Sequence, residues 1–232
     1  MSAGVLFGHA TTRKEAPPAK PGDRHAGGWT LEDFAREQIQ GLVRQVFFSN
    51  AERPVRQVVF SAVEPETDVR SICRQVGEAL ALETADTVAL AGEYLEILRD
   101  ADQEDTPPRP AGGDGAVLRQ DATRVRGNLW MVPAAKKHEE RVTTVELHSY
   151  LCEMRREFKY SIVAGPPARE SNKATAMARF ADGIILVLTA HRTRRNTALK
   201  IMEGLEAAQA HILGTVLSGR MFPIPERIYR RL

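Results

Sequence analysis

Residues 58–71 read "VVFSAVEPETDVRS", and this stretch decides the expected fold. Its apolar start is typical of a buried strand, and its acidic middle is typical of a short loop. Asp68 is the kind of residue that begins a helix. Many α/β proteins bind a phosphate at such a junction, but they use glycines and a lysine to do so. The carboxylates of Glu64, Glu66 and Asp68 would instead repel a triphosphate.

Apolar runs alternate with amphipathic stretches along most of the chain. Strands are expected at residues 55–63, 86–92, 128–134, 160–167, 181–190 and 211–219. Helices are expected at residues 29–50, 68–82 and 142–157, and again after residue 190. Continuous apolar strands separated by helices indicate a doubly wound α/β fold, in which helices cover both faces of a mostly parallel sheet.

The helices are expected to bury one apolar face each. The positions are Phe34, Ile39, Leu42, Val46 and Phe47 in the first helix; Val69, Ile72, Cys73, Val76, Ala79 and Leu80 in the second; Val145, Leu147, Leu151 and Met154 in the third; and Leu199, Met202 and Leu205 in the last. Thr30 is the expected N-cap of the first helix.

Composition divides the chain into a domain with flexible parts. Residues 1–28, rich in proline, glycine and charge, predict a disordered arm, and residues 29–222 the α/β domain. Residues 100–127 predict a flexible insertion within that domain. The tail, residues 223–232, has apolar side chains that favour docking, while its Tyr229 offers an alternative role in phosphorylation.

The overall charge and the cysteines exclude some classes of function. A formal charge of +2 spread over 232 residues does not favour nucleic acid as a partner. Cys73 and Cys152 are distant in sequence and lack a partner at metal-ligand spacing, so we expect buried thiols and no metal site. The longest apolar run, residues 183–188, is too short to span a membrane, and no signal peptide is evident, so we expect a cytoplasmic protein.

Two stretches carry a resemblance to a known family. Residues 158–220, which include "YSIVAGPP", "ADGIILVL" and "LGTVLSG", resemble the bacterial tyrosine kinases of capsule and exopolysaccharide synthesis. Residues 36–66 are similar to the part of these kinases that leads into their phosphate loop. These kinases belong to the deviant-Walker P-loop ATPases, together with septum-site and plasmid-partition proteins. The resemblance implies a P-loop NTPase fold and, for active members, ATP and Mg²⁺ as cofactors.

The first departure from the family lies in the phosphate loop. Against the family's "PGEGKST", Glu66 and Asp68 replace glycines and Val69 replaces the lysine. A shift of one residue would instead place Arg70 at the lysine position and Ser71 at the position of the magnesium-binding hydroxyl. The guanidinium of arginine is a poor substitute for the compact ammonium of lysine.

The other departures concern the metal and the base. Gly92 and Tyr94 stand where the resemblance places two aspartates, and Ala164 stands in place of a magnesium-associated aspartate. Ser218 replaces the asparagine that reads adenine in the resembling proteins. Phosphoryl transfer depends on lysine, on Mg²⁺ and on the carboxylates that hold it. We therefore expect no catalytic residue and no cofactor, with ATP and Mg²⁺ as the alternative.

Two charged clusters leave alternatives open. The acidic loop could bind a divalent cation, but such residues are more typical of helix caps. Arg192, Arg194 and Arg195 could bind an anion, but they are more typical of the start of a surface helix, with Thr193 or Asn196 as its cap.

These observations favour a non-catalytic component of polysaccharide synthesis or export. Its expected partner is a membrane polysaccharide co-polymerase or an active kinase paralogue, through which the chain could attach to the inner membrane. An active tyrosine autokinase that uses Arg70 and Ser71 is one alternative, and a DNA-associated partition-type protein is another. The family's assembly helix starts here at Glu37 but has Gln40 and Val43 in place of arginines, which leaves the oligomeric state open.

Overall fold

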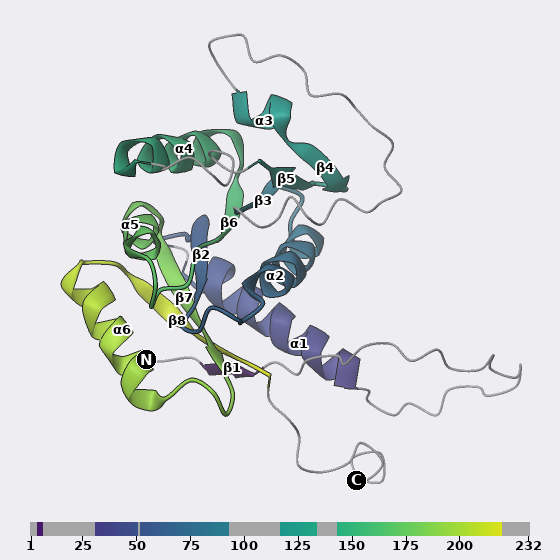
Figure 1. Ribbon diagram of the computed structural model, residues 1–232. Helices are drawn as coiled ribbons and strands as arrows, with labels where there is room; N and C mark the ends of the chain where they lie inside the picture. Colours follow the sequence, from purple (N-terminus) through teal and green to yellow (C-terminus); the bar gives the residue numbers. More distant parts are fainter. Residues whose placement is uncertain (1–3, 7–30, 51, 93–116, 134–142, 220–232) are drawn as a thin grey trace, which may run out of the picture.

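An eight-stranded, mostly parallel sheet forms the centre of the molecule (Figure 1). The computed structural model describes residues 4–6, 31–50, 52–92, 117–133 and 143–219. The strands are β1 Gly4–Leu6, β2 Gln57–Ala62, β3 Val88–Gly92, β4 Thr123–Arg126, β5 Leu129–Val132, β6 Tyr160–Ala164, β7 Gly183–Thr189 and β8 Ile212–Ser218. Their order is β1-β8-β7-β2-β6-β3-β5-β4, and β4 runs antiparallel to β5.

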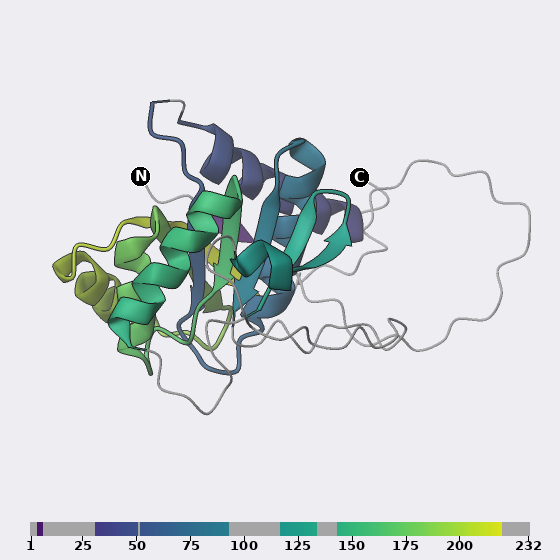
Figure 2. The ribbon, with the colours of Figure 1, turned by 90° about the horizontal axis from the view of Figure 1, so that it is seen from above.

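Helices cover both faces of the sheet, so the predicted doubly wound α/β fold is confirmed. They are α1 Leu31–Val43, followed by the π-helix η1 Arg44–Phe48, then α2 Val69–Glu83, α3 Val117–Asp121, α4 Thr144–Glu157, α5 Asn172–Phe180 and α6 Arg195–Ala207. One core cluster lies between the sheet and α1 and α2, and a second lies between the sheet and α4, α5 and α6. Figures 1 and 2 show α1 and α4 on opposite sides of the sheet. None of the described helices is long and apolar enough to cross a membrane.

Two regions predicted to be flexible contain regular structure. Gly4–Leu6, within the predicted disordered arm, form β1 because they pair in parallel with Thr215–Leu217 at the edge of β8. Helix α3 and strand β4 lie within the predicted insertion, residues 100–127. Leu118 of α3 packs against the second core cluster, and β4 pairs with β5. Residues 1–3, 7–28 and 100–116 of these regions lie outside the described part of the chain.

Several predictions about burial were wrong. Val145 is 74% exposed and Leu199 is 41% exposed, because α4 and α6 are rotated so that Tyr150 and Ala198 face inward. Cys152 is exposed because it lies on the outer surface of α4, whereas Cys73 is buried as predicted. Helix α5 was not predicted from the sequence; it is rich in alanine and buries Ala174 and Ala178.

Some predictions concern residues that the structure does not describe. These are the cap Thr30, the site position Tyr94, the candidate phosphorylation site Tyr229 and the tail, residues 223–232. For the last described helix, neither proposed cap is correct. Arg194 occupies the N-cap position of α6, and the hydroxyl of Thr193 instead accepts a hydrogen bond from the backbone N–H of Thr189.

Candidate functional site

The carboxyl end of β2 is the position at which a doubly wound fold would bind a ligand. The chain leaves β2 for α2 on one face of the sheet, whereas it leaves the neighbouring strands β6 and β7 for α5 and α6 on the other face. Connections that diverge in this way open a crevice at the carboxyl ends of the strands. The loop from Val63 to Asp68 lies at this end of the sheet, so we call it the candidate nucleotide loop.

The candidate nucleotide loop closes on itself in a short turn. The N–H of Thr67 donates to the carbonyl of Glu64 at 3.2 Å, with Pro65 at the second position, which is typical of a β-turn. The N–H of Val69 donates to the carbonyl of Thr67 at 2.9 Å, and the N–H of Ser71 donates to Oδ1 of Asp68 at 3.1 Å. Three backbone donors that could contact a phosphate therefore already have acceptors.

The backbone of the candidate nucleotide loop does not require glycine. Among the described non-glycine residues, positive φ angles occur at His191 and Gln209, both outside this loop. Asp68 caps α2 through its side chain. The cap prediction for the acidic loop is therefore confirmed for Asp68. Among the described residues, no group of three or more His, Cys, Asp or Glu side chains is placed to hold a metal ion.

Side chains from the end of β7 and from the loops that follow β6 and β7 contact the candidate nucleotide loop. The hydroxyls of Thr67 and Thr189 share a hydrogen bond of 2.7 Å. Arg169, which follows β6, pairs with Glu64 at 3.2 Å. Arg192, which follows β7, lies 4.0 Å from Glu66, with both side chains exposed. An exposed ion pair such as Arg192–Glu66 stabilises a fold by at most about 1 kcal/mol, so its main effect is to place an arginine and a carboxylate across the crevice.

Val69, the residue aligned with the family's lysine, points into the protein. It is 7% exposed and belongs to the core cluster beneath α1 and α2. Arg70 is partly buried, and its side chain lies in the first turn of α2. The hydroxyl of Ser71 accepts a hydrogen bond from Gln75 at 3.2 Å. Of these three residues, Arg70 and Ser71 lie nearer the surface, while Val69 contributes to packing.

The structure brings Gly92 and Ala164 together. They are register partners on β3 and β6, so the two positions aligned with metal-associated aspartates are adjacent. A Cβ atom at Gly92 would lie 2.8 Å from both Cβ and the carbonyl oxygen of Ala164. Real Cβ atoms do not approach other atoms so closely, so residue 92 cannot bear a side chain unless one of the two strands moves.

Ser218 ends β8 two strands away from the candidate nucleotide loop. It is buried, it pairs with Thr189, and its carbonyl accepts a hydrogen bond from the N–H of Ala190 at 2.8 Å. A hollow of about 260 Å³ lies beside these residues, between the ends of β7 and β8. This volume is below the range of about 300–1,000 Å³ that is usual for small-molecule sites.

Cys73 lies behind the candidate nucleotide loop on α2. Complete burial of the thiol raises its pKa well above the ordinary range, and the nearby Asp68 carboxylate raises it further. The thiol therefore stays protonated and chemically inert.

Sequence reasoning missed the residues that connect distant parts of the chain. Thr189, at the end of β7, and Arg169, in the segment between β6 and α5, contact the candidate nucleotide loop. No sequence pattern around either residue predicts this contact. Asp182 lies at the other end of the strands, directly before the amino end of β7. Its Oδ2 accepts hydrogen bonds from the N–H groups of Arg56 and Gln57 at 2.7 and 2.8 Å, and its Oδ1 pairs with Arg155 at 2.9 Å. A lone carboxylate just before the most apolar strand is the signal that could have identified Asp182.

Solved structures share this fold. The chain aligns with the chimerical protein CapA2B2 at a TM-score of 0.65 and 13% identity, over 81% of this chain and 86% of that one. It aligns with the kinase domain of the Escherichia coli tyrosine kinase ETK at 0.61 and 14%, over 82% and 77%. The MinC:MinD cell division protein complex of Aquifex aeolicus gives 0.56 and 15%, over 72% and 69%.

No family model and no curated protein matches the sequence. At identities of 13 to 15%, the structural matches establish the fold, which bacterial tyrosine kinase domains and MinD-like ATPases share.

Proposed function

We propose that the chain is a non-catalytic relative of the tyrosine autokinases of capsule and exopolysaccharide systems, and that it acts by binding a partner in polysaccharide synthesis or export. The fold of the kinase domains supports the relationship. The observation that carries the proposal is the closed candidate nucleotide loop, in which the N–H groups of Thr67, Val69 and Ser71 all bind acceptors within the chain.

Charge and packing around the candidate nucleotide loop support the same conclusion. A bound triphosphate would lie near the carboxylates of Glu64 and Glu66, and the arginines that could offset its charge, Arg169 and Arg192, pair with these carboxylates. The position of the family's lysine is occupied by the buried Val69. The short approach between Gly92 and Ala164 leaves no space for a carboxylate at residue 92. In the described part of the chain, these positions therefore offer neither a lysine for a phosphate nor a carboxylate at residue 92 for a metal, which supports the proposal.

The partner we propose is a membrane polysaccharide co-polymerase or an active kinase paralogue. A non-catalytic kinase fold can regulate such a system because it presents a surface like that of the active protein without turning over ATP. Attachment to the inner membrane would then occur through the partner.

Binding of Mg-ATP is the first test of this proposal. A ligand present at 100 times its Kd raises the free energy of unfolding by about 2.7 kcal/mol, so millimolar Mg-ATP would reveal even weak binding as a rise in melting temperature. We expect no rise for this chain and a clear rise for the kinase domain of ETK, measured under the same conditions. A rise for this chain would contradict the proposal and favour an active nucleotide site that uses Arg70 and Ser71.

Partner capture is the second test. The products of genes that neighbour this one would be co-expressed with the tagged chain, and a co-polymerase or kinase should co-purify with it. A variant with Arg169→Ala and Arg192→Ala tests whether the partner binds at the crevice. If this variant still binds the partner, the partner surface lies elsewhere on the domain. Failure of a co-polymerase and of a kinase to bind would contradict the proposed partner.

A further inference from the structure

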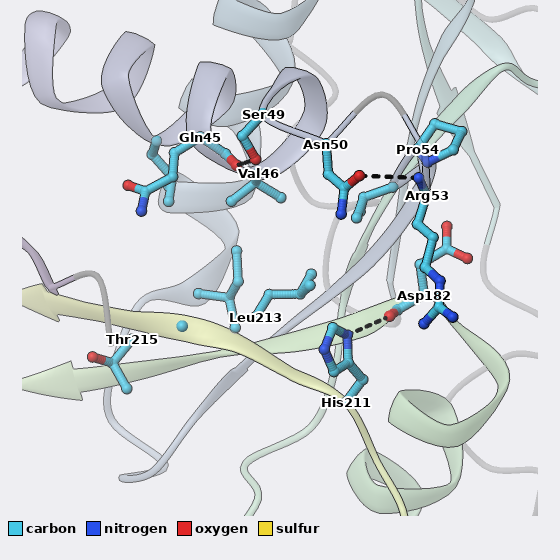
Figure 3. Close-up of a pocket in the computed structure, with 14 residues that line it drawn as sticks. Gln45, Val46, Ser49, Asn50, Arg53, Pro54, Asp182, His211, Leu213 and Thr215 are labelled. Carbon is cyan, nitrogen blue, oxygen red and sulfur yellow. Dashed lines mark hydrogen bonds between the residues drawn. The ribbon is translucent and has the colours of Figure 1, made fainter. Parts of the chain in front are cut away.

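A second cavity lies at the amino ends of the parallel strands, whereas the candidate nucleotide loop lies at their carboxyl ends (Figure 3). It occupies about 580 Å³ between η1 and the amino ends of β7 and β8, beside the segment that leads into β2. This volume lies within the range of small-molecule sites, about 300–1,000 Å³. We call it the amino-edge cavity.

The floor of the amino-edge cavity is apolar. It is formed by Leu42, Val46, Val55, Ile185 and Leu213, which come from α1, η1, the approach to β2, β7 and β8. Figure 3 shows Val46 and Leu213 facing each other across the space. An aliphatic group placed here would be removed from water, which stabilises its binding.

Hydrogen-bond donors gather at one end of the amino-edge cavity. Oδ1 of Asn50 accepts hydrogen bonds from the backbone N–H groups of Glu52 and Arg53, each at 3.1 Å. This arrangement fixes the amide so that Nδ2 is directed toward the cavity in Figure 3. The exposed guanidinium of Arg53 also lines the space, and it forms no ion pair with any residue in the described part of the chain.

The carboxylate that lines the amino-edge cavity does not cancel this positive charge. Asp182 uses both of its oxygens elsewhere, since they bind the N–H groups of Arg56 and Gln57 and the guanidinium of Arg155. Its backbone carbonyl contacts Nδ1 of His211 at 3.2 Å, which holds the imidazole at the rim. The polar end of the cavity therefore presents donors and a cation, and it suits an anion.

The wall of the amino-edge cavity contains an irregular helix. Residues 44–48 form the π-helix η1, and Gln45 and Val46 of this segment line the space. A π-helical turn is wider than an α-helical turn and is found frequently at functional sites. Ser49 follows η1 at the mouth, where its hydroxyl donates to the carbonyl of Gln45.

We propose that the amino-edge cavity binds a small amphipathic carboxylate. Its aliphatic body lies on the floor formed by Val46, Ile185 and Leu213, and its carboxylate accepts hydrogen bonds from Asn50 and Arg53. The proposal does not depend on the function proposed above, because the cavity and the candidate nucleotide loop lie at opposite ends of the parallel strands.

Calorimetry with the full-length chain tests the proposal, with octanoate as the probe and 1-octanol as the uncharged analogue. We expect octanoate to bind and octanol to bind at least about tenfold more weakly, a difference of about 1.4 kcal/mol. Arg53→Ala should weaken octanoate binding by about tenfold or more. Arg56→Ala is the matched control, since it removes a nearby exposed arginine that does not line the cavity, and it should leave the affinity unchanged.

A steric variant tests the location of the ligand. Ser49→Trp places a large ring at the mouth from an exposed position and should abolish octanoate binding. Arg53 is exposed as well, so its replacement keeps the test decisive even if the tryptophan variant does not fold. The proposal is overturned if the unaltered chain does not bind millimolar octanoate, if octanol binds as tightly as octanoate, or if Arg53→Ala binds octanoate with unchanged affinity.

Discussion

Replacing Val69 by lysine tests the geometry of the candidate nucleotide loop directly. In the family pattern a lysine at this position binds phosphate, but here the side chain is 7% exposed within the core cluster. Losing a buried valine costs about 1.5–3 kcal/mol, and an ammonium group forced toward the same core adds a desolvation cost. We expect Val69→Lys to lower the free energy of unfolding by at least about 3 kcal/mol. At about 2–4 °C per kcal/mol for a chain of this size, the melting temperature should fall by about 6–12 °C.

Urea denaturation followed by circular dichroism measures this loss, provided that the slope of the transition is unchanged. Arg70→Lys is the matched control, because it leaves the charge in the partly buried first turn of α2, and it should change the stability by less than about 1 kcal/mol. We expect neither variant to bind Mg-ATP. A Val69→Lys protein as stable as the parent, or one that gains affinity for Mg-ATP, would show that residue 69 reaches the crevice and would refute this reasoning.

Three further predictions concern packing and reactivity, and the first two are measured by urea denaturation. Gly92→Ala should destabilise the fold by about 1–3 kcal/mol because its Cβ would lie 2.8 Å from Ala164 on the neighbouring strand. Gly41→Ala is the control: a Cβ there would have nothing within 4 Å and should stabilise α1 by up to about 1 kcal/mol. If Gly41→Ala were the more destabilising change, the register of β3 and β6 would be contradicted. Asp182→Ala should cost about 2–3 kcal/mol because two backbone N–H groups and Arg155 lose their acceptor, and a neutral result would mean that water replaces the carboxylate. In a thiol-titration assay, the exposed Cys152 should react in the native protein and the buried Cys73 only in denaturant; rapid reaction of both would indicate that α2 opens readily.

The sequence predicted the sheet because the strongest signals were local. The strand "GIILVLT" of β7 is buried over most of its length, and the amphipathic pattern after Asp68 gives a helix that starts one residue later. These patterns depend on burial from both sides, which α/β folds impose on their central strands. The helix faces were less accurate, because the sequence pattern around Val145 and Leu199 does not fix how α4 and α6 are rotated on the sheet.

Elements at the edges of the sheet were missed for a different reason. Strand β1 has three residues and is held by pairing with β8, while β4 is mostly exposed and pairs with a single neighbour, β5. Neither strand has a long apolar run, so neither gives a signal of its own. Short edge strands depend on tertiary pairing, which a single sequence does not reveal.

The candidate site shows the same division between local and distant information. Asp68 was recognisable as a cap because its partner, Ser71, is three residues away. The contact between Thr67 and Thr189 spans 122 residues and depends on the register of β2 and β7. Gly92 and Ala164 were singled out separately through the family resemblance, and their direct contact emerges only in the folded chain.

This contact explains why the departures from the family pattern are not independent of one another. A carboxylate at residue 92 needs space that the backbone of Ala164 now occupies, so restoring it alone would strain two central strands. A phosphate in the candidate nucleotide loop would need N–H groups such as those of Thr67 and Ser71, which have acceptors inside the chain. Releasing each of these hydrogen bonds costs about 0.5–1.5 kcal/mol before any ligand contact forms. If the proposed function is correct, we expect nucleotide binding to require coordinated changes in the loop, in the adjacent strands and at the core position of Val69, and no single substitution should confer it.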